Sequence, residues 1–336
     1  MSLSIGIVGL PNAGKSTLFN ALVRGHQAKV ADYPFTTIEP NVGMVEVPDN
    51  RLQHIADSLQ LPKKISATIK FIDIAGLVKN AHQGEGLGNQ FLSHIREVDA
   101  IIHILDGFSK DANPEEAKEI VNIELELAGI KKPTLYVFNV KEKYLIDKKS
   151  LFGELGSQKW VASATERNVS DAFVKRTSFD DKRALNMLDI SAKMEEELID
   201  LPPKEAEEYL KSYGLSESGL VRLIKESYKL LNLITFYTLK LANSQQLTAD
   251  SPAYAKDTAA GQIQAWPILK GTKAPQAAGI VHTDMEKGFI AAEVCPYEEL
   301  IKFPSWTQAR EDGKIRTEGK DYSIQDNDIV HFKFNL

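Results

Sequence analysis

The residues best suited to chemistry stand near the start of this 336-residue chain, in the run Gly9-Leu-Pro-Asn-Ala-Gly14-Lys15-Ser16. This run fits G-x-x-x-x-G-K-[ST] and lies between an apolar stretch and a helical one, which is the context that the pattern requires. Its glycines allow backbone N–H groups to surround phosphate oxygens, and the following helix N-terminus adds a positive dipole. The run predicts a nucleotide phosphate site, although a glycine-rich turn without a ligand is the alternative. The expected phosphate-binding residues are Asn12, Ala13, Gly14, Lys15, Ser16 and Thr17.

Four residues are expected to act on the phosphates and on a magnesium ion. The Lys15 ammonium would neutralise β- and γ-phosphate oxygens, and the Ser16 hydroxyl would bind Mg²⁺. Asp73 ends the apolar run 69–74, where a carboxylate can support Mg²⁺ while the N–H of Gly76 meets the γ-phosphate. A helix-capping role is the alternative for Asp73.

A loop with two threonines, 33–40, lies between the first predicted helix and the second predicted strand. A threonine in this place can reach Mg²⁺ when a triphosphate is bound, so the order of the loop would depend on the nucleotide state. Thr36 and Thr37 both qualify, and Thr37 is chosen as the metal ligand. The alternative is a rigid loop that its prolines fix.

Asn139, Val140 and Glu142 are expected to line the site of the nucleotide base, directly after the apolar run 135–138. A guanine-selective enzyme has N-K-x-D here, and its aspartate accepts hydrogen bonds from N1–H and the 2-amino group of guanine. In this chain valine replaces the lysine and the longer glutamate replaces the aspartate. A polar site mismatched to its ligand can lose about 10⁴-fold in discrimination, so strong selectivity for guanine is not expected. The run 191–193, Ser-Ala-Lys, would close the base pocket.

Short β-branched runs alternate with helical patterns in the first half of the chain. This alternation predicts an α/β domain with a mostly parallel sheet flanked by helices. The expected strands are 4–9, 41–47, 68–74, 100–106, 133–139 and 184–190. The expected helices are 16–23, 89–98 and 114–128, the last of them capped by Asn113 with a proline at its first position.

Two domains are expected. Residues 1–231 are assigned to a nucleotide-binding domain with an irregular insertion near 143–183. The pattern after 202 predicts helix as far as 242. Residues 232–336 are assigned to a second domain, whose later part has the short alternating runs of strands.

Composition and charge exclude several classes of protein. Hydrophobic residues make up 43% and charged residues 26%, as in folded soluble proteins, and the net charge of −6 does not favour DNA or an anionic membrane as a partner. The single cysteine, Cys295, indicates a reducing compartment. Neither a signal peptide nor an uncharged run of the ~18–20 residues that span a bilayer is visible. A cytoplasmic location is therefore expected.

Together with longer runs of sequence, these motifs resemble the Obg-like ATPase, or YchF, subfamily of translation-associated P-loop NTPases. The likeness is dense at both ends of the chain and thins between about 143 and 262. It implies a G-domain-like unit followed by a small α+β TGS domain of the β-grasp type, which the family associates with ribosome or RNA contact. The runs that carry the resemblance are 9–22, 33–43, 71–79, 84–91, 95–99, 270–279 and 318–322.

The resemblance also implies a Mg²⁺-dependent switch that binds ATP, with GTP the less favoured substrate, and acts on ribosomes or their RNA and protein. In the family, N-x-x-E accompanies a preference for ATP. Leu77 stands where Ras-type enzymes have a glutamine that orients the attacking water, so slow hydrolysis is expected. Two alternatives stay open: a GTPase of the broader Obg type, and a non-hydrolysing ribosome-binding scaffold that keeps the nucleotide.

Two features depart from the family pattern. Its members carry a long antiparallel helical arm between the strands that end near 106 and begin near 133, and residues 107–132 are too few for one. The histidine that the family has on a mobile loop there is also absent. His82 is the local candidate for assisting hydrolysis, because a neutral imidazole can accept a hydrogen bond from water. The alternative is a solvated loop residue.

Overall fold

A computed structural model of the protein describes residues 3–26, 28, 41–74, 87–109, 112–146, 187–240 and 261–335. These residues divide into two compact units. The first unit holds the described residues up to 26, from 41 to 45 and from 69 to 231, and the second holds 28, 46–68 and those from 232 onward. The expected insertion after 146 lies outside the described residues.

The first unit is built on a six-stranded sheet in the order β2-β4-β1-β5-β6-β7. β1 pairs in parallel with β4 and β5, and β6 pairs in parallel with β5 and β7. The strands confirm the expected α/β sheet. Their bounds are β1 Ser4–Val8, β2 Val42–Glu46, β4 Thr68–Asp73, β5 Ala100–Asp106, β6 Thr134–Asn139 and β7 Met187–Ile190.

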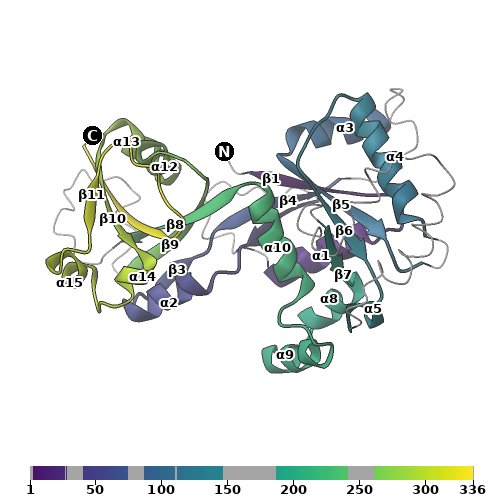
Figure 1. The fold of residues 1–336 in the computed structure, drawn as a ribbon, viewed down its shortest axis with the longest axis horizontal. Coiled ribbons are helices and arrows are strands. Elements are labelled where there is room, and N and C mark those ends of the chain that lie inside the picture. Colours follow the sequence, from purple (N-terminus) through teal and green to yellow (C-terminus); the bar gives the residue numbers. More distant parts are fainter. Residues whose placement is uncertain are drawn as a thin grey trace, which may run out of the picture. The chain divides into compact units, whose positions relative to one another are not determined.

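Helices flank this sheet (Figure 1). Apolar side chains of α3 and α4, among them Ile95 and Val121, pack in one buried cluster with Val8 of β1 and Ile101 of β5. Asn113 caps α4 by accepting a hydrogen bond from the N–H of Glu116, as the sequence predicts. The helices of this unit are α1 Lys15–His26, α3 Leu87–Glu97, α4 Pro114–Leu127, α5 Lys143–Ile146, α8 Ala192–Ile199, α9 Pro203–Ser212 and α10 Gly219–Leu230.

The second unit has its own six-stranded mixed sheet, in the order β11-β10-β12-β8-β9-β3. Its strands are β3 Lys63–Ile65, β8 Leu233–Lys240, β9 Gln262–Leu269, β10 Phe289–Pro296, β11 Arg316–Glu318 and β12 Asp328–Phe334. Its helices are α2 Asn50–Ser58, α12 Ala274–Val281, α13 Thr283–Lys287, α14 Tyr297–Leu300 and α15 Trp306–Glu311.

The expectation of helix from 202 to 242 is wrong for its last part. α10 ends at Leu230, Asn232 takes a left-handed backbone conformation with φ 53°, and the chain continues as β8. β8 is rich in β-branched and aromatic residues, which favour a strand. It pairs antiparallel with β9 and parallel with β12, so the backbone groups of the segment bond across the sheet.

The segment 46–68 groups with the second unit, although the sequence assigns all of 1–231 to one domain. β3 pairs in parallel with β9, with Lys63 opposite Gln262 and Ile65 opposite Gln264. α2 contacts β3, β9 and α14. The chain therefore passes between the two units on each side of this segment as well as at 231–232.

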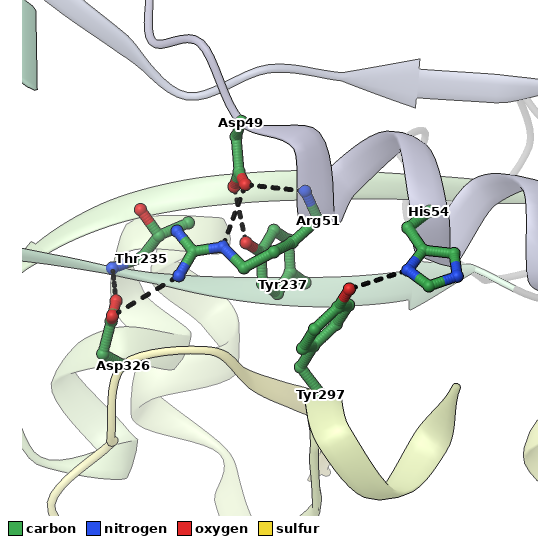
Figure 2. Close-up of polar contacts among 7 residues, drawn as sticks. All are labelled: Asp49, Arg51, His54, Thr235, Tyr237, Tyr297 and Asp326. Atoms are coloured by element: carbon green, nitrogen blue, oxygen red, sulfur yellow. Dashed lines mark hydrogen bonds and ion pairs between the residues drawn. The ribbon is translucent and has the colours of Figure 1, made fainter. Parts of the chain in front are cut away.

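A polar network fixes the start of α2 within the second unit (Figure 2). The Asp49 carboxylate accepts hydrogen bonds from the N–H of Arg51 at 3.0 Å and from the hydroxyl of Tyr237 at 2.5 Å. Arg51 pairs with Asp326 at 3.6 Å, and Asp326 accepts a bond from the N–H of Thr235. Burial, followed by the bond to Asp49, raises the pKa of Tyr237. The phenol therefore stays a donor to this carboxylate.

Among the described residues, no helix has the length and apolar composition needed to cross a membrane. Cys295 is buried and free, and burial raises the pKa of its thiol to about 11. This cysteine is a core residue.

Candidate nucleotide-binding site

The predicted phosphate loop connects β1 directly to α1. Gly9 and Gly14 have positive φ angles of 153° and 91°, and Asn12 takes the left-handed conformation at 64°. A Cβ on Gly14 would lie 2.2 Å from Nδ2 of Asn139, and one on Gly9 would lie 2.4 Å from the carbonyl oxygen of Ile104. Glycine is therefore required at both positions by conformation and by space.

Lys15, the first residue of α1, lies buried across this loop. Its ammonium donates a hydrogen bond to the carbonyl oxygen of Leu10 at 2.9 Å. Burial lowers the pKa of Lys15, and the charge of Asp73 acts in the opposite direction. Ala13 is buried in the loop, Thr17 is half-buried, and Asn12 and Ser16 are exposed. Lys15 is also the first residue of the twelve-residue helix α1, so a cation and a helix N-terminus occur together at the end of the loop.

Ser16 and Asp73 lie together, as the metal prediction requires. The Ser16 hydroxyl donates to Oδ2 of Asp73 at 3.1 Å. The register of β1 with β4 sets Asp73 opposite Ile7, just before the loop. The other carboxylate oxygen, Oδ1, is buried and has no hydrogen-bond partner within the described part of the chain. Burial raises the pKa of Asp73, against the effects of Ser16 and Lys15.

These observations fit a bound Mg²⁺ ion. Mg²⁺ prefers hard oxygen ligands and is held by one or two protein groups together with phosphate oxygens and water. A hydroxyl next to a carboxylate with one unsatisfied oxygen provides such groups, and a buried unpaired carboxylate oxygen is otherwise costly. The remaining predicted residues around the phosphates, Thr37, Gly76 and His82, lie outside the described residues.

Asn139 connects the phosphate loop to the side of the site expected to hold the base. Its Nδ2 donates to the carbonyl oxygen of Ala13 at 3.1 Å, and its Oδ1 accepts from the N–H of Ala192 at 3.0 Å. The side chain is buried at the end of β6. Asn139 therefore holds together two loops that lie far apart in the sequence.

Val140 and Glu142 have different surroundings. Val140 is buried in a cluster with Leu105, Ala117 and Phe138, so its described contacts are those of a core residue. Glu142 is accessible, and its carboxylate pairs with the ammonium of Lys193 at 3.7 Å. Of the three predicted base-site residues, the structure thus leaves the Glu142 side chain accessible to a ligand and buries the other two.

Sequence reasoning missed Glu195, which supports this side of the site. Glu195 lies on α8, buried, and accepts a hydrogen bond from the N–H of Gly219 at 2.7 Å, at the first residue of α10. Ser191 caps α8 by accepting from the N–H of Met194. No local pattern could have revealed Glu195, because its partner lies 24 positions further along the chain.

His103 is fully buried on β5, as its apolar run indicates. Neither ring nitrogen has a hydrogen-bond partner among the described residues. Burial, together with the nearby charges of Lys118 and Lys15, lowers its pKa to about 3. His103 therefore stays neutral at physiological pH.

Two family models match parts of the chain. One, described as a 50S ribosome-binding GTPase, matches residues 4–140, and the other, a YchF GTPase C-terminal domain described as a protein of unknown function, matches 258–335. Over the whole of both chains, this chain is 38% identical to the ribosome-binding ATPase YchF of Bacillus subtilis (strain 168). It is 36% identical, over the same full extent, to that of Escherichia coli O157:H7. It also resembles the solved structure of the Schizosaccharomyces pombe YchF GTPase, with a TM-score of 0.74 and 28% identity across 99% of this chain and 98% of the other.

The alignment with the Bacillus subtilis relative runs over 386 positions, more than the 336 residues of this chain. The relative therefore contains segments that this chain lacks. Between β5 and β6, the described residues hold the single helix α4.

Proposed function

The chain belongs to the YchF family of P-loop nucleoside triphosphatases, and from this premise we propose that it is a Mg²⁺-dependent ATPase. It hydrolyses ATP slowly and uses the nucleotide to switch its action on the ribosome in the cytoplasm. The observation that carries the proposal is the pair formed by Ser16 and Asp73, with an unsatisfied carboxylate oxygen beside the buried Lys15.

Each residue of the phosphate side has a proposed role. The backbone from 12 to 17 binds the phosphates, Lys15 neutralises charge that develops on them, and Ser16 and Thr37 bind Mg²⁺ with support from Asp73. The N–H of Gly76 meets the γ-phosphate. Bound Mg²⁺ would supply charge stabilisation at the phosphates.

A preference for ATP over GTP is part of the proposal. Asn139 is committed to the two loops that it joins, and Glu142 stands where a guanine-selective enzyme has a shorter aspartate. The extra methylene displaces the carboxylate from the position that suits both guanine donors. The relatives from Bacillus subtilis and Escherichia coli O157:H7 are named ATPases, which supports the same choice.

The ribosome is the proposed partner. Both relatives are named ribosome-binding, and the family model that matches residues 4–140 is described as a 50S ribosome-binding GTPase. The two alternative functions predict different experimental results. A GTPase would bind GTP at least as tightly as ATP, and a scaffold would bind nucleotide and ribosomes without hydrolysis.

The deciding experiment combines affinities with single-turnover kinetics on the full chain. Dissociation constants for ATP and GTP, measured by calorimetry with Mg²⁺, should be at least tenfold lower for ATP. Single-turnover hydrolysis of ATP should be slow and should accelerate when ribosomes are added. Equal or tighter GTP binding would establish the GTPase alternative, and no hydrolysis in either condition would establish the scaffold.

His82 is proposed to orient the attacking water, because Leu77 has no polar group for this task. Positioned acid–base assistance is typically worth ~10²–10⁴ in rate. His82→Ala should therefore slow single-turnover hydrolysis at least tenfold while ATP affinity stays within twofold. A variant that hydrolyses ATP at the parent rate would rule out this role.

A further inference from the structure

Lys193 forms an ion pair with the accessible carboxylate of the base site. Its ammonium lies 3.7 Å from Oε1 of Glu142 and 3.7 Å from Oε1 of Glu197, which is one turn further along α8. The Lys193 side chain is 75% exposed, whereas that of Glu142 is 23% exposed. Glu142 is thus the less exposed member of the pair and Lys193 the more exposed one.

The backbone around Lys193 is fixed from two directions. The N–H of Ala192, the residue before it, donates to Oδ1 of Asn139. The Ser191 hydroxyl caps the first turn of α8, in which Lys193 is the second residue. These two hydrogen bonds fix the start of α8 relative to Asn139, which lies three residues before Glu142. The backbones that carry Lys193 and Glu142 are therefore held close to each other.

The pair matters because guanine and adenine make different demands on a carboxylate. Guanine presents two donors side by side, N1–H and the 2-amino group, and needs both oxygens of a carboxylate to satisfy them. The Lys193 ammonium already lies beside one of the two, Oε1. Adenine has an acceptor at N1 and no 2-amino group, so it cannot donate this pair of hydrogen bonds to the carboxylate.

We propose that Lys193 is a specificity-determining residue that lowers affinity for GTP by pairing with Glu142. The proposal rests on the proposed nucleotide site and adds to it a second residue, outside the N-x-x-E run, that acts against guanine. Lys193 acts through the carboxylate and does not need to touch the base. Its effect must therefore vanish when Glu142 can no longer form an ion pair.

The size of the effect follows from the exposure of the pair. Exposed ion pairs contribute little, and their measured range corresponds to a change of about twofold to fivefold in an equilibrium constant. Lys193→Met, which keeps the length and the apolar stem of the side chain, should raise GTP affinity by about twofold to fivefold. Affinity for ATP should change by a smaller factor than affinity for GTP, because adenine does not present N1–H and a 2-amino group to this carboxylate.

The test measures dissociation constants of non-hydrolysable ATP and GTP analogues with Mg²⁺ for the full chain and its variants. Lys193→Arg should keep the parent ratio, since arginine can pair with the same oxygen. Glu197→Gln is the matched control: it removes the other partner of Lys193, keeps an acceptor for the Tyr209 hydroxyl, and should leave the ratio unchanged.

A double variant distinguishes the mechanism. In a Glu142→Gln background, Lys193→Met should change GTP affinity by less than about 1.5-fold. Either an unchanged GTP affinity in the single variant or an equal gain in both backgrounds would overturn the proposal. If the unmodified chain binds GTP as tightly as ATP, the proposed preference for ATP is contradicted. The role of Lys193 is decided separately, by whether Lys193→Met raises GTP affinity.

Discussion

At the scale of single residues, the Asn139 amide joins two parts of the site, because both of its polar atoms bond to backbone groups of separate loops. Asn139→Ala would leave the carbonyl oxygen of Ala13 and the N–H of Ala192 without these partners. Each buried unsatisfied group costs about 1–3 kcal/mol. We expect this variant to lose about 2–4 kcal/mol in free energy of unfolding, measured by urea denaturation, and to bind ATP at least tenfold more weakly.

A matched control is available on α4. Asn122 also accepts a hydrogen bond, from the Tyr136 hydroxyl at 3.2 Å, but this bond joins α4 to β6 and does not involve the phosphate loop. Asn122→Ala should cost about 1 kcal/mol and leave ATP affinity unchanged. Equal losses of ATP affinity in both variants would show that the Asn139 effect is a general loss of stability.

Residue types predicted some roles and not others. The spacing of Gly9, Gly14 and Lys15 predicts a glycine-dependent loop followed by a helix. The structure has this loop, with positive φ angles at both glycines and a helix that begins at Lys15. Val140, which is expected beside the base, also packs in a buried cluster, and those packing partners come from other elements that the local pattern does not reveal. The sequence could not predict that the ring nitrogens of His103 have no described hydrogen-bond partner, because such partners come from other elements of the fold.

At the scale of elements, α8 is held against α10 by one buried carboxylate. Glu195 accepts the N–H of Gly219 at the start of α10, and burial raises the pKa of Glu195 above its ordinary value of 4.5 despite these bonds. The folded protein therefore keeps a proton on Glu195 at pH values where the unfolded chain has lost it. Its contribution to stability is present below pH 4.5 and falls as the pH rises above that value.

Glu195→Gln removes this titration while it keeps an oxygen acceptor for the helix N-terminus. The free energy of unfolding of the parent protein, relative to that of Glu195→Gln, should fall as the pH rises from 4.5 towards neutrality. Urea denaturation at a series of pH values would measure the difference. A difference that rises with pH would mean that the ionised carboxylate is the favoured form in the folded protein.

Strands β1 and β5 of the first sheet were predictable because parallel strands covered on both faces are near-continuous apolar runs. β5 is such a run and has the predicted bounds. β8 was missed because its apolar residues follow α10 closely and continue a pattern that local reasoning assigns to helix. Only its pairing with β9 and β12 establishes the strand.

At the scale of the whole molecule, the segment 46–68 depends on residues almost 200 positions away. The Tyr237 hydroxyl bonds to Asp49 at the start of α2 (Figure 2). Tyr237→Phe would leave one carboxylate oxygen without this donor, at a cost of about 1.5–3 kcal/mol for a bond to a charged group. Tyr297→Phe, which removes an exposed bond to His54, should cost about 0.5 kcal/mol or less. Chemical denaturation of the two variants would compare them, and similar losses would contradict an anchoring role for Tyr237.

A fragment of residues 1–231 should lose the structure of α2. The fragment lacks β8 and β9, so β3 loses its pairing partner and the buried Leu52 and Ile55 lose much of their cover. Amide hydrogen exchange in α2 should become at least tenfold faster than in the full chain. Exchange in α4, whose core contacts lie within the first unit, should change little. Unchanged protection of α2 in the fragment would show that this segment folds without the second unit.

Because β3 pairs with β9, the position of a genetic crossover should decide whether a recombinant protein folds. A single genetic crossover near codon 231 would join one parent's β3 to another parent's β9, although Lys63–Ile65 and the facing residues from Gln262 onward form one ladder. The same exchange would pair a foreign Tyr237 with a native Asp49. The two units are therefore expected to be inherited together. Chimaeras that take 46–68 and the residues from 232 onward from the same parent should express as folded protein more often than chimaeras divided at 231.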